Sequence, residues 1–203
     1  MLRVGLTGGL ASGKSFVGGQ LSELGCLLIQ ADEIGRQVQQ EGAEAYEEIV
    51  REFGAGILRP DRQIDRRKLA EQVFGRPDQL QKLNRIVHPL VRARMEKEIA
   101  EFAAREPRGI AVVEAAILVE TGSFRSYDRL IVVVASEEQQ IERAMARDHI
   151  SREEALSRMR RQMPLAEKVK YADYIIDSSG SKEHTIEQTR AVYASLRSLS
   201  SGE

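Results

Sequence analysis

Eight residues near the N-terminus have the types and spacing of a phosphate-binding loop. Residues 8–15, Gly-Gly-Leu-Ala-Ser-Gly-Lys-Ser, match the pattern G-x-x-x-x-G-K-S. Their glycines allow a tight turn in which successive backbone amides point into one concavity that suits an anion. Lys14 supplies a positive charge for the β- and γ-phosphates, and the Ser15 hydroxyl is a ligand for Mg²⁺. The segment predicts binding of a nucleoside triphosphate.

The chain on both sides of this loop agrees with that prediction. Leu2, Val4 and Leu6 alternate before the loop, which predicts a strand, and apolar residues follow it at helical spacing. An accidental glycine-rich turn would lack this strand-to-helix context. The residues expected to contact the triphosphate are Gly8, Gly9, Ala11, Ser12, Gly13, Lys14, Ser15 and Phe16.

Asp32 is the first candidate for chemistry outside the loop. It follows the apolar run 26–30, which is typical of a buried parallel strand. Ligands of open α/β sheets bind at the carboxyl ends of the strands, so this carboxylate is placed to face the phosphates. There it would accept a proton from an attacking hydroxyl or hold Mg²⁺, directly or through water. A helix N-cap is an equal and compatible alternative.

Other charged residues have a structural interpretation that competes with a functional one. Glu114 ends the apolar run 110–113 and resembles an acid that positions Mg²⁺, but an ordinary charged strand end is favoured. His88 precedes Pro89 at an expected helix start, where a cap or surface position is favoured over a general base. Arg143 and Arg147 lie one helical turn apart and could belong to a lid over the nucleotide.

The lid helices carry many more basic residues. For any one of them a solvated helix face is favoured, because acidic residues are interspersed. They are Arg152, Arg158, Arg160, Arg161, Lys168 and Lys170.

The order of expected elements predicts an α/β fold, a three-layer, doubly wound, parallel five-stranded sheet. The strands are expected at residues 2–7, 26–30, 109–114, 129–134 and 174–177. Helices are expected at 14–24, from about 32, at 43–53, from Ser136 to about 147, from Ser151, and at 182–199. Asp65 to Arg105 appears wholly helical, with Asp65 as a cap and Pro77 and Pro89 in the first turns of two further helices.

This pattern predicts one domain, 1–203, with two helical additions. The core is expected at about 1–55, 109–140 and 171–203, an acceptor-binding insert at 56–108, and a lid at 141–170. The net charge of −1 gives no general attraction to nucleic acid or anionic membranes. No apolar run is long enough for a membrane span, and no leader is evident, so a cytoplasmic location is expected. Cys26 lies among apolar residues and is expected to be buried.

Several nucleotide-binding classes fit less well than a small-molecule kinase. A GTP-driven switch needs D-x-x-G, which residues 32–35 match, but they follow the second strand too closely and no N-K-x-D is present. G-x-G-x-x-G is also absent, which argues against dinucleotide binding. Another nucleoside or nucleotide kinase, or a non-catalytic nucleotide binder, remains an alternative.

Ordered motifs along nearly the whole chain resemble the dephospho-coenzyme A kinase family. The helical insert contains N-x-x-x-H-P-L at residues 84–90, which a generic kinase would not require. The other similar segments are 4–15, Ala31-Asp32 with Arg36, 117–120, 140–143 with Arg147, 162–164 and 172–177. Three positions depart from the family pattern, namely Gln30 for an aspartate, Ala116 for a proline and Ser179 near the usual asparagine.

The resemblance implies transfer of the ATP γ-phosphate to the ribose 3′-hydroxyl of dephospho-coenzyme A, with Mg²⁺. It implies that Asp32 and Lys14 are catalytic and that Ser15 and Asp32 hold the metal. It also implies that Asp32, Arg36 and His88 bind the acceptor. Arg143 and Arg147 are implied to belong to the lid over ATP. The small-molecule acceptor is the expected partner, with no nucleic acid or membrane.

Overall fold

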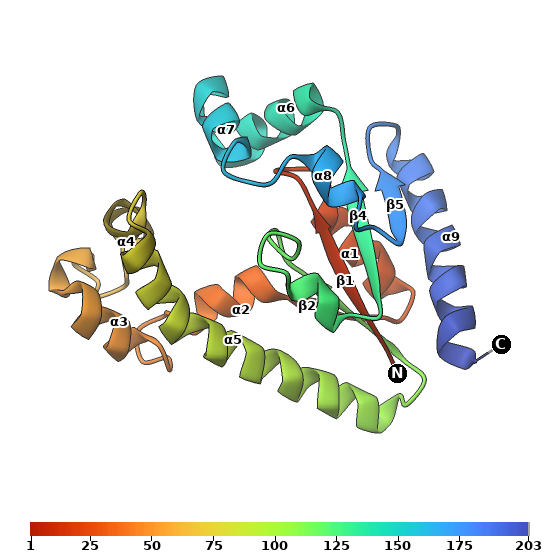
Figure 1. Ribbon diagram of the computed structural model, residues 1–203, viewed down its shortest axis with the longest axis horizontal. Helices are drawn as coiled ribbons and strands as arrows, with labels where there is room; N and C mark the ends of the chain where they lie inside the picture. The colour runs from red at the N-terminus through yellow and green to blue at the C-terminus, as the bar shows by residue number, and fades with distance from the viewer. Residues whose placement is uncertain (203) are drawn as a thin grey trace. The chain divides into compact units, whose positions relative to one another are not determined.

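Five parallel strands form one sheet within residues 1–202, which are the residues that the computed structural model describes (Figure 1). They are β1 (Leu2–Gly8), β2 (Leu27–Gln30), β3 (Ile110–Glu114), β4 (Arg129–Val134) and β5 (Tyr174–Asp177). Their order is β2-β3-β1-β4-β5, with every pair parallel. The predicted sheet is confirmed, and each strand lies within one residue of its expected bounds.

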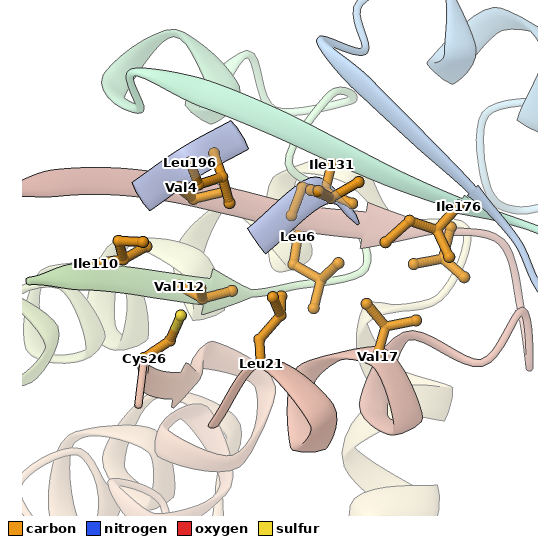
Figure 2. Packing of buried hydrophobic residues seen from close by; sticks show 12 residues of the cluster. Val4, Leu6, Val17, Leu21, Cys26, Ile110, Val112, Ile131, Ile176 and Leu196 are labelled. Carbon is orange, nitrogen blue, oxygen red and sulfur yellow. The ribbon is translucent and has the colours of Figure 1, made fainter. Parts of the chain in front are cut away.

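Apolar side chains of the sheet and of two helices form the main core (Figure 2). Val4 and Leu6 point to one face of β1, where Val17 and Leu21 of α1 (Lys14–Glu23) pack against them. Helix α9 (Lys182–Ser201) adds Val192 and Leu196 on the same face. On the other face, a Cβ at Gly5 would meet the side chains of Leu118, Tyr127 and Leu130. The sheet is therefore covered on both sides, as in a doubly wound fold.

Cys26 belongs to this core and is only 5% exposed. Its burial raises the pKa of the thiol to about 12, because the thiolate would lose its hydration. The thiol therefore stays protonated and inert at neutral pH. The prediction that this cysteine is structural is confirmed.

Residues 31–100 form a compact unit of their own, and residues 1–30 with those from 101 onward form the other. The helices of the first unit are α2 (Ala31–Gln37), α3 (Tyr46–Phe53), the short 3₁₀ helix Ala55–Ile57, α4 (Arg66–Val73) and the start of α5 (Pro77–Arg105). Asp65 caps α4 by accepting hydrogen bonds from the backbone amides of Arg67 and Lys68. Both this cap and the start of α5 at Pro77 are confirmed.

The expectation that Pro89 begins a third helix is wrong. Helix α5 runs without interruption through His88 and Pro89 to Arg105. Proline removes one backbone hydrogen bond and costs about 3 kcal/mol inside a helix. Burial of Ile86, Val87 and Ile99 along α5 offsets this cost, so tertiary packing overrides the local signal.

Three helices lie between β4 and β5, where a lid is predicted. They are α6 (Glu137–Asp148), α7 (Arg152–Met159) and α8 (Leu165–Val169), and the 3₁₀ helix Ser123–Ser126 precedes β4. Ser136 and Ser151 cap α6 and α7, as predicted, by accepting from the amides three residues on. Ile141, Ala144 and Ala155 form a separate apolar cluster that joins these two helices. In the described part of the chain, no helix has the length and apolar character of a membrane span.

Candidate active site

Backbone geometry at residues 8–15 is that of a tight loop between a strand and a helix. Strand β1 ends at Gly8 and helix α1 begins at Lys14, so the loop leaves the sheet edge and enters a helix N-terminus. Gly13 has φ 88°, which favours glycine. A Cβ on Gly8 would overlap the Val133 carbonyl oxygen. Both glycines are therefore required by the backbone path itself.

The polar side chains of the loop are held close to its backbone. Lys14 Nζ donates to the Gly9 carbonyl oxygen at 3.0 Å. The Ser178 hydroxyl donates to the Ser12 carbonyl at 2.8 Å. Within residues 1–202 the buried Ser12 Oγ has no hydrogen-bond partner. A cradle with an unsatisfied hydroxyl and a cation at its mouth suits a phosphate chain.

Glu114 joins the loop to the second strand of the site. Its Oε1 accepts a hydrogen bond from Ser15 Oγ at 2.7 Å, and its Oε2 accepts one from Gln30 Nε2 at 3.2 Å. The side chain is 7% exposed, because the register places it between Leu6 of β1 and Gln30 of β2. Glu114 is buried and directly contacts the predicted metal ligand, which favours the Mg²⁺-positioning interpretation over that of an ordinary charged strand end.

The substitution of the family's aspartate by Gln30 has a physical consequence at this point. An acid at position 30 would place a second carboxylate beside Glu114, and like charges at that separation disfavour each other. The Gln30 amide instead donates to Glu114, so the pair carries a single negative charge. This chain therefore has one strand-end carboxylate beside Ser15 rather than two.

Arg143 and Arg147, the predicted lid arginines, differ in their surroundings. The Arg143 guanidinium donates to Ser178 Oγ at 2.9 Å and to the Ser178 carbonyl at 2.8 Å. Ser178 is the residue whose hydroxyl donates to the Ser12 carbonyl of the phosphate loop. Arg147 pairs with Asp148 at 2.7 Å, and Arg158 bonds the same carboxylate. The Arg147 guanidinium holds the pKa of Asp148 below its usual range, and the carboxylate raises the pKa of Arg147. Of these two arginines, Arg143 is the one linked to the phosphate loop, through Ser178.

A cavity of about 570 Å³ adjoins the loop at Gly9. Its walls come from the start of α6, the end of α7, the segment that joins α7 to α8, and the start of α8. Residues that line it include Gln140, Leu156, Met159, Arg160, Met163 and Leu165. The wall is mostly apolar, as in pockets that hold an organic group beside a few polar anchors.

The three acceptor-side candidates all lie in the unit 31–100. Asp32 is in the first turn of α2, which begins at Ala31, so it is not the N-cap that was the alternative. Its exposed carboxylate still interacts favourably with the positive, N-terminal end of the α2 dipole. Arg36, on the same helix, pairs with Glu33 at 2.8 Å, and His88 is exposed in the middle of α5.

Three functional candidates escaped the sequence interpretation or were undervalued by it. Glu114 had a local signal, an acid ending an apolar strand, but its contact with Ser15 depends on strand register. Ser178 and the buried Lys168 had no distinguishing signal. The expectation of a solvated position is wrong for Lys168, which is 0% exposed, but holds for Lys170, which pairs with Glu167 at the surface.

Known proteins are similar to this chain in both sequence and fold. A family model described as dephospho-CoA kinase matches residues 2–184. The curated dephospho-CoA kinase from Carboxydothermus hydrogenoformans is 47% identical over 185 residues, 91% of this chain and 89% of that protein. A crystal structure from Thermus thermophilus is similar at TM-score 0.85 and 34% identity, covering 96% of this chain and 97% of the other. Dephospho-CoA kinase from Campylobacter jejuni has TM-score 0.61 and 27% identity, covering 96% of each chain.

Proposed function

This chain belongs to the dephospho-CoA kinase family, and we propose that it transfers the γ-phosphate of ATP to the ribose 3′-hydroxyl of dephospho-coenzyme A. The products are coenzyme A and ADP. The observation that carries the proposal is the family match over residues 2–184, which includes the phosphate loop, the unit 31–100 and α6 to α8. A nucleotide-binding switch is not favoured, because the guanine-reading N-K-x-D is absent from the sequence.

The phosphate loop is proposed to neutralise the triphosphate. The amides that follow Gly8, the N-terminus of α1 and the Lys14 ammonium supply positive potential around the β- and γ-phosphates. Phosphoryl transfer depends mainly on positioning and on stabilising charge on the transferred group. Arg143, which is anchored to Ser178 beside the loop, is proposed to add a further cation on the lid side.

Asp32 is proposed to receive or orient the proton of the acceptor hydroxyl. It lies two residues beyond Gln30, whose amide bonds the carboxylate that contacts Ser15. A carboxylate at this position in the chain is a suitable base for a hydroxyl that attacks in line with the leaving group. Arg36 and His88, in the same unit, are proposed to bind the acceptor, with residues 56–108 as its insert and 141–170 as the lid.

The oxygen atoms beside Lys14 fit Mg²⁺ as the metal of the reaction. Mg²⁺ prefers oxygen ligands and usually keeps several waters while bound by one or two protein groups and the phosphates. Ser15 Oγ and the Glu114 carboxylate form such an oxygen pair, and Asp32 is a further candidate. No cluster of three or more His, Cys, Asp or Glu that could hold a metal ion occurs among residues 1–202. When bound, the ion would neutralise charge that develops on the phosphate oxygens.

Glu114→Gln tests this assignment. The variant keeps an oxygen for Ser15 but removes the charge. We therefore expect the Mg²⁺ concentration for half-maximal activity to rise by at least about 10-fold, the smallest loss typical when even an outer-shell partner of a metal is removed. The measurement is a Mg²⁺ titration of ADP release, together with calorimetry of Mg²⁺–ATP binding. Glu106→Gln, an exposed carboxylate of the same unit, serves as the control. An unchanged Mg²⁺ requirement would remove Glu114 from the metal site.

A panel of acceptors tests the proposed function. ADP release is measured with dephospho-coenzyme A, with nucleosides, with nucleoside monophosphates and without acceptor, using ATP and GTP as donors in turn. We expect turnover with dephospho-coenzyme A and ATP, and a product whose 3′-phosphate is identified by ³¹P NMR. Turnover only with a nucleoside or nucleotide would support the alternative kinase. Nucleotide binding without transfer to any acceptor would contradict enzymatic activity.

A further inference from the structure

Lys168 is a fully buried cation next to the phosphate loop. It belongs to the short helix α8 and is 0% exposed, whereas its neighbour Lys170 is exposed. Burying an ammonium group is costly unless it is paired and hydrogen-bonded. The hydrogen-bond and ion-pair partners of this ammonium group therefore indicate which parts of the site Lys168 holds in place.

Three acceptors converge on the three N–H donors of this ammonium group. Nζ donates to the Ala116 carbonyl at 2.7 Å and to the Gly8 carbonyl at 3.3 Å, and it pairs with Glu120 Oε1 at 2.7 Å. A lysine ammonium has three donors and no acceptor, so this set satisfies it completely. Within residues 1–202, Glu120 is the carboxylate that pairs with this ammonium group.

The Lys168 partners come from segments that are far apart in the sequence. Gly8 ends β1 and opens the phosphate loop, and Ala116 lies two residues beyond Glu114 of β3. Glu120 Oε1 also accepts a hydrogen bond from the backbone amide of Met163, at the end of the segment joining α7 to α8. Thr7 Oγ1 donates to the same Ala116 carbonyl at 3.2 Å. One ion pair, in which the lysine is fully buried and the Glu120 side chain is 21% exposed, therefore joins the start of the loop, the end of β3 and the returning lid segment.

The Gly8 carbonyl is one residue from the carbonyl that holds Lys14. Gly9 accepts from Lys14 Nζ, and Gly9 also lines the cavity whose wall includes Met163. A shift of the Gly8 carbonyl would change the path of the loop, and a shift of Met163 would change the wall of this cavity. The ion pair adds no net charge to the site, so its effect on a nucleotide would come from geometry rather than from attraction.

We propose that the Lys168–Glu120 ion pair is a positioning device that sets the phosphate loop against the returning lid segment for ATP binding. Lys168 acts through the Gly8 carbonyl, and Glu120 acts through the Met163 amide. The proposal rests on the proposed function only in taking ATP as the nucleotide. It is independent of the acceptor.

A purely structural role makes a different prediction, and a pair of variants separates the two. Replacing one partner of a buried pair leaves an uncompensated charge and is strongly destabilising, whereas replacing both is often neutral. Lys168→Met is therefore compared with the double variant Lys168→Met/Glu120→Gln, in which the Gln oxygen still accepts from Met163. Lys170→Met removes an exposed lysine two residues on and is the matched control.

The experiment measures thermal unfolding, calorimetric ATP binding without acceptor, and kcat and KM for each substrate. A displacement of roughly 1 Å at a site costs about 10²-fold in rate, so we expect kcat/KM for ATP to fall about 10- to 100-fold in both Lys168 variants. Lys168→Met should have a lower Tm and a raised Kd for ATP. The double variant should recover the wild-type Tm but keep the raised Kd for ATP. The KM for the acceptor should stay at the wild-type value, and Lys170→Met should match wild type throughout.

Recovery of both the Tm and the ATP Kd in the double variant would overturn the proposal and leave the pair a structural one. If the double variant does not fold, Lys168→Arg decides. It retains the charge for Glu120, but a planar guanidinium cannot meet three converging acceptors as an ammonium does. A wild-type ATP Kd in Lys168→Arg would overturn the proposal. Since ATP binding is measured without acceptor, failure of the acceptor assignment would leave these results unaffected.

Discussion

Asp32→Asn is expected to lower kcat by about 10²- to 10⁴-fold, the range that a positioned general base contributes. Asparagine has the same shape as aspartate and hydrogen-bonds in a similar way, but it cannot accept a proton. The acceptor hydroxyl would then attack without a base, whereas the loop that binds the triphosphate is unchanged. The effect should therefore lie in kcat rather than in ATP affinity.

Steady-state ADP release with dephospho-coenzyme A gives kcat and KM, and calorimetry gives the Kd for ATP. Glu48→Gln removes an exposed carboxylate from the same unit and should behave as wild type. Near-wild-type turnover in Asp32→Asn would disprove the catalytic assignment. Recovery of its activity at raised Mg²⁺ would instead assign Asp32 to the metal.

Lys14→Ala is expected to lower kcat/KM for ATP by about 10²- to 10³-fold, as is usual when one preorganised charge-stabilising group is removed. The Lys14 ammonium is held over the loop by the Gly9 carbonyl, so little reorganisation is needed when phosphate arrives. Alanine leaves the loop amides in place but removes the mobile charge that follows the β- and γ-phosphates. Both ATP affinity and turnover should fall.

Steady-state ADP release gives kcat/KM for Lys14→Ala, and the Tm increase caused by saturating Mg²⁺–ATP reports binding without turnover. We expect this increase to be largely lost in the variant at a concentration that stabilises the wild type. Arg190→Ala, which removes an exposed cation from α9, should keep it. A full ATP-induced Tm increase in Lys14→Ala would show that the loop holds the triphosphate without its lysine.

Local patterns in the sequence were sufficient for the sheet and for most helix ends. Each strand is a short apolar run, and the caps at Asp65, Ser136 and Ser151 act on amides two or three residues away. The phosphate loop is equally local, since its glycines and Lys14 are adjacent in the chain. Signals of this kind depend on neighbouring residues and are present before the chain folds.

Where a local signal competed with packing, packing prevailed. Pro89 is a strong breaker by itself, yet the burial of α5 on both sides of it keeps the helix continuous. Asp32 is a favoured cap, but α2 begins one residue earlier, directly after β2. The expected division into an acceptor-binding insert and a lid remains a functional prediction.

What the sequence by itself determined is the phosphate loop, the order of strands and helices, and the family to which they point. Only the tertiary structure decided which distant residues support the loop. Glu114 meets Ser15 across 99 positions, and Lys168 meets Gly8 across 160. These contacts depend on strand register and on the return of α8 to the sheet, which no local pattern encodes. A buried acid and a buried lysine thus look in the sequence like surface charges.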